Sequence, residues 1–268
     1  MNLPRLGQGT WNMGDSPAKR AEELATLREG IDLGMTLVDT AEMYGNGCSE
    51  SLVAEAIAGQ REKVFLVTKV LPTNASRKGV ARACEASLKR LKTDRVELYL
   101  LHWPGSHPLE ETVRGFEDLL AAGKIGAWGV SNLDLSEMNG LVAIRGGVAC
   151  VANQVLYNLS RRGIEFDLLP WCRERGIAIM AYTPIEQGRI LGHKALVAVA
   201  KRLDATPAQV ALAWVLRQDG VVTIPKASTV AHVRANRGAL DLRLDAEALR
   251  ALDAAFAPPA KARPLEML

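Results

Sequence analysis

Eight short apolar runs, each ending in a polar or small residue, recur along the 268 residues of this chain. Runs of about four to eight aliphatic and β-branched residues are typical of strands buried in a parallel sheet. Their ends lie 23 to 43 residues apart, and one strand–helix unit needs roughly 30 residues. The predicted strands cover 3–10, 36–40, 64–69, 96–102, 127–132, 150–155, 178–183 and 221–226.

Amphipathic patterns fill the gaps between these strands. The first of them repeats apolar residues at a spacing near 3.6 and stops at Gly34, as helices commonly do. Ser49 is expected to cap the second helix, because its hydroxyl can accept from a free backbone N–H. The predicted helices cover 17–34, 49–59, 77–91, 109–123, 163–176, 194–203, 206–220 and 245–256.

Regular alternation of eight strands with helices predicts an α/β fold, a (β/α)8 TIM barrel. We expect a single domain over residues 1–268, with extra helices near the C-terminus. The alternative is an open, doubly wound sheet. In the glycine-rich segment 7–12, however, Asn12 stands where the dinucleotide fingerprint of that fold has its third glycine.

Composition excludes several classes of protein. The 33 Lys and Arg against 30 Asp and Glu leave a net charge of +3, too balanced for a dedicated nucleic-acid binder. No apolar run reaches the roughly 18 residues of a membrane span, and the first residues lack the basic-then-apolar order of a secretory signal. The 4 cysteines show no C-x-x-C spacing. We therefore expect a cytoplasmic protein with no metal site, and no obligate protein partner is evident from the sequence.

Polar and ionisable residues gather where the predicted strands end, the face at which barrel enzymes carry their catalytic groups. Taken singly, Asp39 could cap a loop and Lys69 could reach solvent. His102 could be a satisfied core histidine, and Tyr44 could decorate a surface loop. All of these explanations would have to hold together, so a catalytic site is the better interpretation. Tyr44 lies in the loop after the second predicted strand. The strand-end residues are Trp11, Asp39, Lys69, His102, Ser131, Asn132, Gln154 and Tyr182.

Several ordered motifs in the chain resemble the aldo-keto reductase family over nearly the whole length. Within that family the chain is most similar to the short bacterial members that reduce methylglyoxal and related small aldehydes. The motifs are LGQGTW (6–11), LVDTAEMYGN (37–46), VTK (67–69), LLHWP (100–104), GKIGAWGVSN (123–132), NQVLYN (153–158), AYTP (181–184) and IPKAS (224–228).

This resemblance implies a catalytic tetrad of Asp39, Tyr44, Lys69 and His102. Reducing a carbonyl by hydride creates an alkoxide that needs a proton, and Tyr44 would be the general acid. The cation of Lys69 is expected to lower the pKa of that phenol, with Asp39 holding the lysine in place. His102 would donate a hydrogen bond to the carbonyl oxygen. The hydride must come from a cofactor, which the resemblance gives as NADPH.

The resemblance also assigns residues to this cofactor and to the substrate. Ser131, Asn132 and Gln154 would hold the nicotinamide carboxamide, and Tyr182 would stack on its ring. The remaining assignments are Ile185 and Gln187 to the pyrophosphate, Lys226, Ser228, Thr229 and His232 to the 2′-phosphate side, Asn236 to the adenine, and Trp11, Trp103 and His102 to the substrate.

Two departures from the family pattern bear on specificity. His232 stands where members that favour NADPH often carry Arg, and Ala235 stands where an acidic residue is frequent. The short segment after Pro264 suggests few specificity contacts, and hence a broad range of small aldehydes. Two other functions stay open. One is a lyase that forms a Schiff base on Lys69. The other is a nicotinamide-binding module with little turnover, like the potassium-channel β-subunits.

Overall fold

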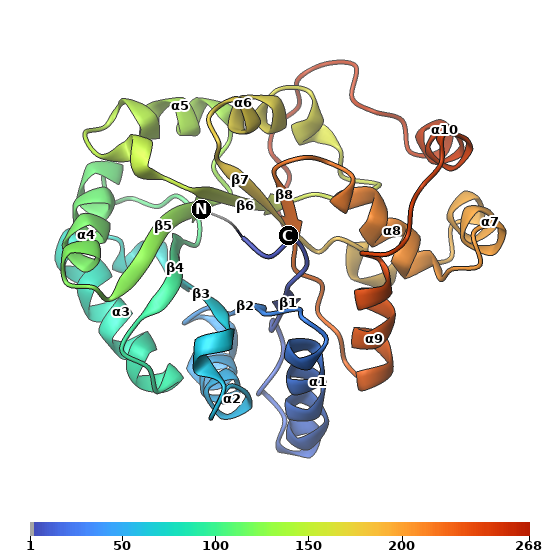
Figure 1. Ribbon diagram of the computed structural model, residues 1–268. Helices are drawn as coiled ribbons and strands as arrows, with labels where there is room; N and C mark the ends of the chain where they lie inside the picture. The colour runs from blue at the N-terminus through green and yellow to red at the C-terminus, as the bar shows by residue number, and fades with distance from the viewer. Residues whose placement is uncertain (1–2) are drawn as a thin grey trace.

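Eight parallel strands follow one another around a closed sheet in the computed structural model, which describes residues 3–268 (Figure 1). A parallel bridge between Leu6 and Thr223 closes the ring, with the Gly7 N–H donating to the Thr223 carbonyl at 2.8 Å. Closure confirms the barrel and excludes the open sheet. The strands are β1 (Gln8–Gly9), β2 (Leu37–Asp39), β3 (Phe65–Val70), β4 (Val96–Leu101), β5 (Ile125–Ser131), β6 (Ala152–Leu156), β7 (Ala178–Tyr182) and β8 (Val221–Thr223).

Ten α-helices accompany the strands within residues 3–268. Most form the outer ring, whereas α7 and α10 pack against each other outside α8 (Figure 1). These two are the extra helices expected near the C-terminus. The helices are α1 (Arg20–Asp32), α2 (Cys48–Ala56), α3 (Arg77–Leu91), α4 (Leu109–Ala121), α5 (Leu135–Ala143), α6 (Leu168–Glu174), α7 (Lys194–Arg202), α8 (Pro207–Leu216), α9 (Val230–Gly238) and α10 (Ala246–Ala255).

Several local predictions need correction. The first strand is much shorter than 3–10, and the segment 163–176 divides into a 3-10 turn and α6. Ser49 does not cap α2, whose N-cap is Gly47. The Ser49 side chain is buried, and its hydroxyl donates to Thr10 Oγ1 at 2.7 Å instead. Helices α5 and α9 were not predicted.

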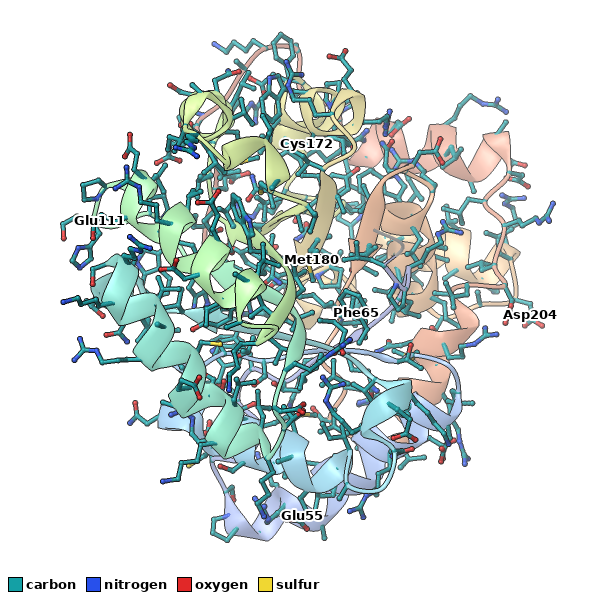
Figure 2. All side chains as sticks on the ribbon, turned by 60° about the vertical axis from the view of Figure 1, so that its left-hand side comes forward. Glu55, Phe65, Glu111, Cys172, Met180 and Asp204 are labelled. Carbon is teal, nitrogen blue, oxygen red and sulfur yellow. The ribbon has the colours of Figure 1, made fainter. Side chains whose placement is uncertain are left out.

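The core lies in two layers. One fills the space between the strands and the helix ring, and the other lies inside the barrel and includes Val67, Leu100 and Met180. Figure 2 shows Met180 in the interior, whereas Glu55 and Glu111 lie at the outer surface. Side chains alternate along a strand, so residues two positions beyond an inward residue also face inward. That rule brings polar side chains at the strand ends into the barrel mouth.

Candidate active site

Strand periodicity places three ionisable groups at the barrel mouth. Leu37, Val67 and Leu100 pack inside the barrel, and Asp39, Lys69 and His102 stand two positions after them. Asp39 and Lys69 lie on β2 and β3, and His102 directly follows β4. All three are buried.

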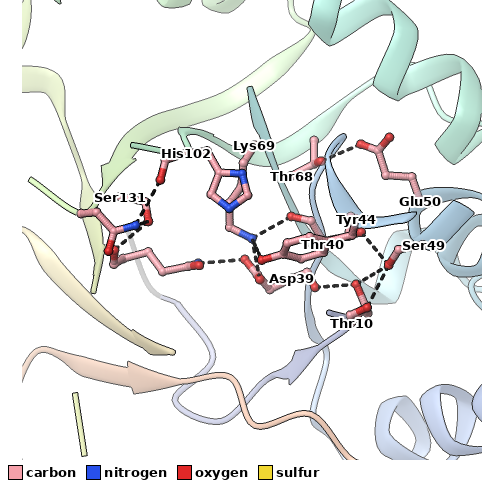
Figure 3. A network of polar contacts seen from close by, with 12 residues as sticks. Thr10, Asp39, Thr40, Tyr44, Ser49, Glu50, Thr68, Lys69, His102 and Ser131 are labelled. Carbon is pink, nitrogen blue, oxygen red and sulfur yellow. Dashed lines mark hydrogen bonds and ion pairs between the residues drawn. The ribbon is translucent and has the colours of Figure 1, made fainter. Parts of the chain in front are cut away.

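Lys69 is the centre of this polar cluster (Figure 3). Its Nζ lies 2.7 Å from Asp39 Oδ2 and donates to the Thr40 carbonyl at 2.9 Å and to Tyr44 Oη at 3.0 Å. Burial by itself would lower the pKa of this ammonium, but Asp39 and Tyr44 outweigh it and leave the pKa above its ordinary value. Lys69 is therefore a fixed cation whose three protons are all committed.

Tyr44 reaches Lys69 from the loop after β2. Three successive left-handed residues, Gly45, Asn46 and Gly47, turn the chain sharply after Tyr44, so that α2 begins at Cys48. Only glycine and asparagine visit this conformation readily, which explains the composition of the loop. Because its oxygen accepts from Lys69, the phenol keeps its own proton to donate elsewhere.

The pKa of Tyr44 differs from the expectation. Burial raises it above the ordinary value, and the opposing effect of Lys69 does not fully offset that rise. The predicted contact with Lys69 is present, and its effect has the predicted sign. The predicted net lowering is wrong in this structure, because the phenolate would lie in a largely dehydrated site.

His102 lines the same cavity as Tyr44. Its ring meets that of Tyr44 edge-on with centroids 5.7 Å apart. Burial and the neighbouring Lys69 lower its pKa to about 2, so the imidazole is neutral. Its Nδ1 is buried and finds no hydrogen-bond partner among residues 3–268. Buried N–H groups without a partner are rarer than unpaired acceptors, which favours a proton on Nε2.

A cavity of about 750 Å³ joins this cluster to the far side of the barrel mouth. Asp39, Tyr44 and His102 line one end, together with Trp11 and Trp103. A cavity of this size and mixed polarity suits a dinucleotide with a small substrate. Lining residues that we did not predict include Met43, Leu191 and Leu268. Leu268 is the one residue after Pro264 that lines the cavity, which agrees with the expectation of few contacts from that part of the chain.

The residues expected around a nicotinamide form a connected set beside the tetrad. The Ser131 hydroxyl donates to the Gln154 carbonyl at 2.8 Å, and Gln154 Nε2 donates to Asp39 Oδ1 at 2.8 Å. Tyr182 donates to Asn132 Oδ1 at 3.0 Å. All four line the cavity. Their side chains are thus fixed by one another before any ligand binds.

Lys226 and His232 line the opposite end of the cavity with Asn236. Lys226 is exposed, and its Nζ donates to Ser228 Oγ at 2.9 Å. Thr229 instead caps α9, accepting from the His232 N–H at 3.2 Å. Its role toward a cofactor stays a prediction.

Two nearby arginines face away from this end. Arg234 pairs with Glu29 at 2.7 Å, and Arg237 pairs with Asp241 at 2.7 Å. Lys226 is consequently the one Lys or Arg that lines the cavity within residues 3–268.

Ile185 and Gln187 line the cavity, and their role toward a pyrophosphate stays a prediction. Thr183, Glu186 and Gln187 all have positive φ angles, near 50°. Such angles are rare for side chains other than Gly, Asn and Asp, and Thr183 is also β-branched. Nothing in the local sequence pattern indicated this conformation, which depends on distant partners of Glu186.

Comparison with known proteins agrees with this geometry. The family model described as "Aldo/keto reductase family" matches residues 5–257. The chain belongs to the aldo/keto reductase family. It is an oxidoreductase by that membership, and the resemblance drawn from the motifs is confirmed.

Named relatives of this reductase include two that act on small dicarbonyls. It is 50% identical to "Methylglyoxal reductase YeaE" of Escherichia coli, an alignment covering 100% of this chain and 96% of the relative. It is 32% identical to "Glyoxal reductase" of Bacillus subtilis, over 95% of this chain and 89% of the relative.

A solved structure has almost the same fold. An aldo/keto reductase from Klebsiella pneumoniae in complex with NADP and acetate has a TM-score of 0.98 and 47% identity, covering 99% of this chain and 96% of that one. Within the described residues, no helix of the reductase is both long and apolar enough to span a membrane. The location, the lack of a metal site and the lack of an obligate partner stay predictions.

Proposed function

We propose that this reductase uses NADPH to reduce small aldehydes and ketoaldehydes of the methylglyoxal type to alcohols, with Tyr44 as the general acid. The observation that carries the proposal is the hydrogen bond from buried Lys69 Nζ to Oη of Tyr44, which lines the large cavity. It leaves the phenolic proton free to pass to a substrate oxygen. The named activities of the two relatives support the substrate class.

The residues that line the cavity offer groups suited to a dinucleotide cofactor. When bound, NADPH supplies the hydride. Ser131, Asn132 and Gln154 offer amide and hydroxyl groups for a carboxamide at the end where the tetrad lies. Lys226, with Ser228 and His232, offers a cation and polar groups for a 2′-phosphate at the other end. NADP in the Klebsiella pneumoniae structure, at 47% identity, supports this choice of cofactor.

The roles of the tetrad follow from its charges. A substrate carbonyl placed between Tyr44 and His102 would receive hydrogen bonds from both, which orient it and stabilise the negative charge developing on oxygen. Neutral His102 donates without adding a second positive charge beside Lys69. Lys69 would stabilise the phenolate left after proton transfer, and the ion pair with Asp39 holds Lys69 in place.

The same geometry argues against a Schiff-base lyase. A lysine must be deprotonated to attack a carbonyl. Lys69 is instead held as a cation by Asp39 at 2.7 Å, and its pKa is raised. A nicotinamide-binding module with little turnover would retain the same residues, so measured turnover separates it from the enzyme.

Steady-state kcat/KM should be measured for methylglyoxal, glyoxal, aromatic aldehydes and keto-sugars, each with NADPH and with NADH. We expect turnover of the small aldehydes and a preference for NADPH. Tight binding of NADPH with no turnover of any carbonyl would support the binding module instead. Trapping of substrate on Lys69 by borohydride without nicotinamide would support the lyase.

A further inference from the structure

One buried carboxylate organises the loop after β7, which lines the cavity. Glu186 is 4% exposed and points away from the cavity. Its carboxylate accepts from Asn158 Nδ2 at 2.7 Å, from Arg189 at 2.8 Å and from Arg161 at 3.1 Å. These bonds outweigh the effect of burial and hold the pKa of Glu186 below its ordinary value, so the group is ionised.

These bonds hold a loop that would not keep its shape unaided. Positive φ angles at Thr183, Glu186 and Gln187 are unfavourable and persist only where surrounding contacts enforce them. Asn158 also donates to the Thr183 carbonyl at 3.0 Å, so both ends of the strained stretch are tied to it. We call residues 183–188 the cofactor loop, because five of its six residues line the cavity.

Arg161 has a second partner on a different part of the chain. Its Nη1 lies 2.5 Å from Glu266 Oε1, and Glu266 belongs to the C-terminal segment, residues 263–268. Leu265 of this segment packs against the core, and Leu268 lines the large cavity. The guanidinium of Arg161 therefore joins the cofactor loop to the C-terminal segment, whose last residue lines the cavity.

We infer that Arg161 is a positioning residue that holds the cofactor loop and the C-terminal segment in fixed relation, so that one side chain supports both the cofactor and the substrate parts of the cavity. This rests on the proposed function. The planar guanidinium of Arg161 can donate to two carboxylates at once, which the single ammonium of a lysine does less well. Glu186 is the partner in the cofactor loop, and Glu266 is the partner in the C-terminal segment.

The test uses four variants to separate the effects of the two contacts of Arg161. For each variant, NADPH affinity is measured by fluorescence titration, and KM for methylglyoxal is measured at saturating NADPH. Arg189→Gln removes a cation from Glu186 without touching Glu266, so it should weaken NADPH binding about tenfold and leave KM unchanged. Glu266→Gln should raise KM about two- to fivefold and leave NADPH affinity unchanged. Arg161→Gln should do both, and Arg161→Lys should restore less than half of either loss.

Hydrogen exchange gives a readout that needs no activity. In the free protein, amides of residues 263–268 should exchange faster in Arg161→Gln and Glu266→Gln than in the wild type or in Arg189→Gln. The inference is overturned if Arg161→Gln behaves like Arg189→Gln, with unchanged KM and unchanged exchange of that segment. Failure of the wild type to bind NADPH and reduce aldehydes would instead overturn the proposed function. The hydrogen-exchange result would still test whether Arg161 holds the C-terminal segment in place.

Discussion

Lys69 donates to three oxygens at once, and each bond limits what the others can do. The carboxylate of Asp39 keeps the ammonium charged although both groups are buried. The Thr40 carbonyl fixes its direction, and the remaining proton points at Tyr44. A charge held this rigidly needs no reorganisation when negative charge develops on the phenol, which is the condition for effective electrostatic catalysis.

Replacing Lys69 tests that arrangement. Lys69→Met removes the cation and keeps roughly the length of the stem, so turnover should be lost. Any residual activity should show the proton donor titrating at a higher pH, because the charge and the hydrogen bond that lower the pKa of Tyr44 both come from Lys69. The measurement is the pH profile of kcat. Full activity in Lys69→Arg would contradict the precise lysine–tyrosine contact, because a guanidinium has a different shape.

His102 makes stability depend on pH. Its pKa is about 2 in the folded chain, against an ordinary 6.5 when unfolded. Between these values the unfolded chain binds the extra proton, so the contribution of His102 is complete above pH 6.5 and declines as pH falls toward 2. The slope approaches about 1.4 kcal/mol per pH unit.

Urea unfolding of the wild type and of His102→Gln at pH 7, 6 and 5 measures this slope. The glutamine variant does not titrate at this position, so its free energy of unfolding should fall less steeply with acidification. Parallel curves for the two proteins would show that His102 is not the buried neutral group described above.

At the scale of single elements, we expect the loop between β8 and α9, together with the first turn of α9, to set the cofactor preference. Lys226 and His232 face the cavity, whereas Arg234 and Arg237 are engaged with Glu29 and Asp241. A reductase with one lining Lys or Arg among its described residues should discriminate by charge only moderately. We expect NADPH to bind about tenfold to a hundredfold more tightly than NADH, since charge-assisted hydrogen bonds contribute about 1.5–3 kcal/mol each before screening by solvent.

Lys226→Ala should remove most of this preference and leave NADH affinity nearly unchanged, because NADH has no 2′-phosphate for Lys226 to contact. His232→Arg should increase it by adding a permanent planar cation. Fluorescence titrations with both cofactors measure the ratio. Equal affinities for NADH and NADPH in the wild type would contradict the assignment of this end of the cavity.

At the scale of the whole molecule, the barrel was predictable because its pattern repeats. Eight apolar runs at similar spacing leave few other topologies, and alternation along strands predicts that Asp39, Lys69 and His102 face one mouth. Short helices carried a weaker signal. Helix α5 has only nine residues and contains Asn139 and Gly140, although the capping box of Asp134 with Glu137 marks its start.

The contacts that shape the cavity could not be predicted in the same way. Arg161 meets Glu186 across 25 residues and Glu266 across 105, and no local pattern relates such positions. The net pKa of Tyr44 was missed for a similar reason, since burial is a property of the folded chain. Sequence periodicity predicts which side chains face the mouth, whereas their hydration and support depend on segments far apart in sequence.

The central claim is that Tyr44 donates the proton during reduction of a carbonyl. Single-turnover oxidation of bound NADPH by methylglyoxal, compared between the wild type and Tyr44→Phe, tests it most directly. The phenylalanine keeps the ring and loses the hydroxyl. The rate should fall by about 10²–10⁴-fold, the usual contribution of general acid catalysis, with NADPH affinity unchanged. An unaltered single-turnover rate in Tyr44→Phe would contradict the account.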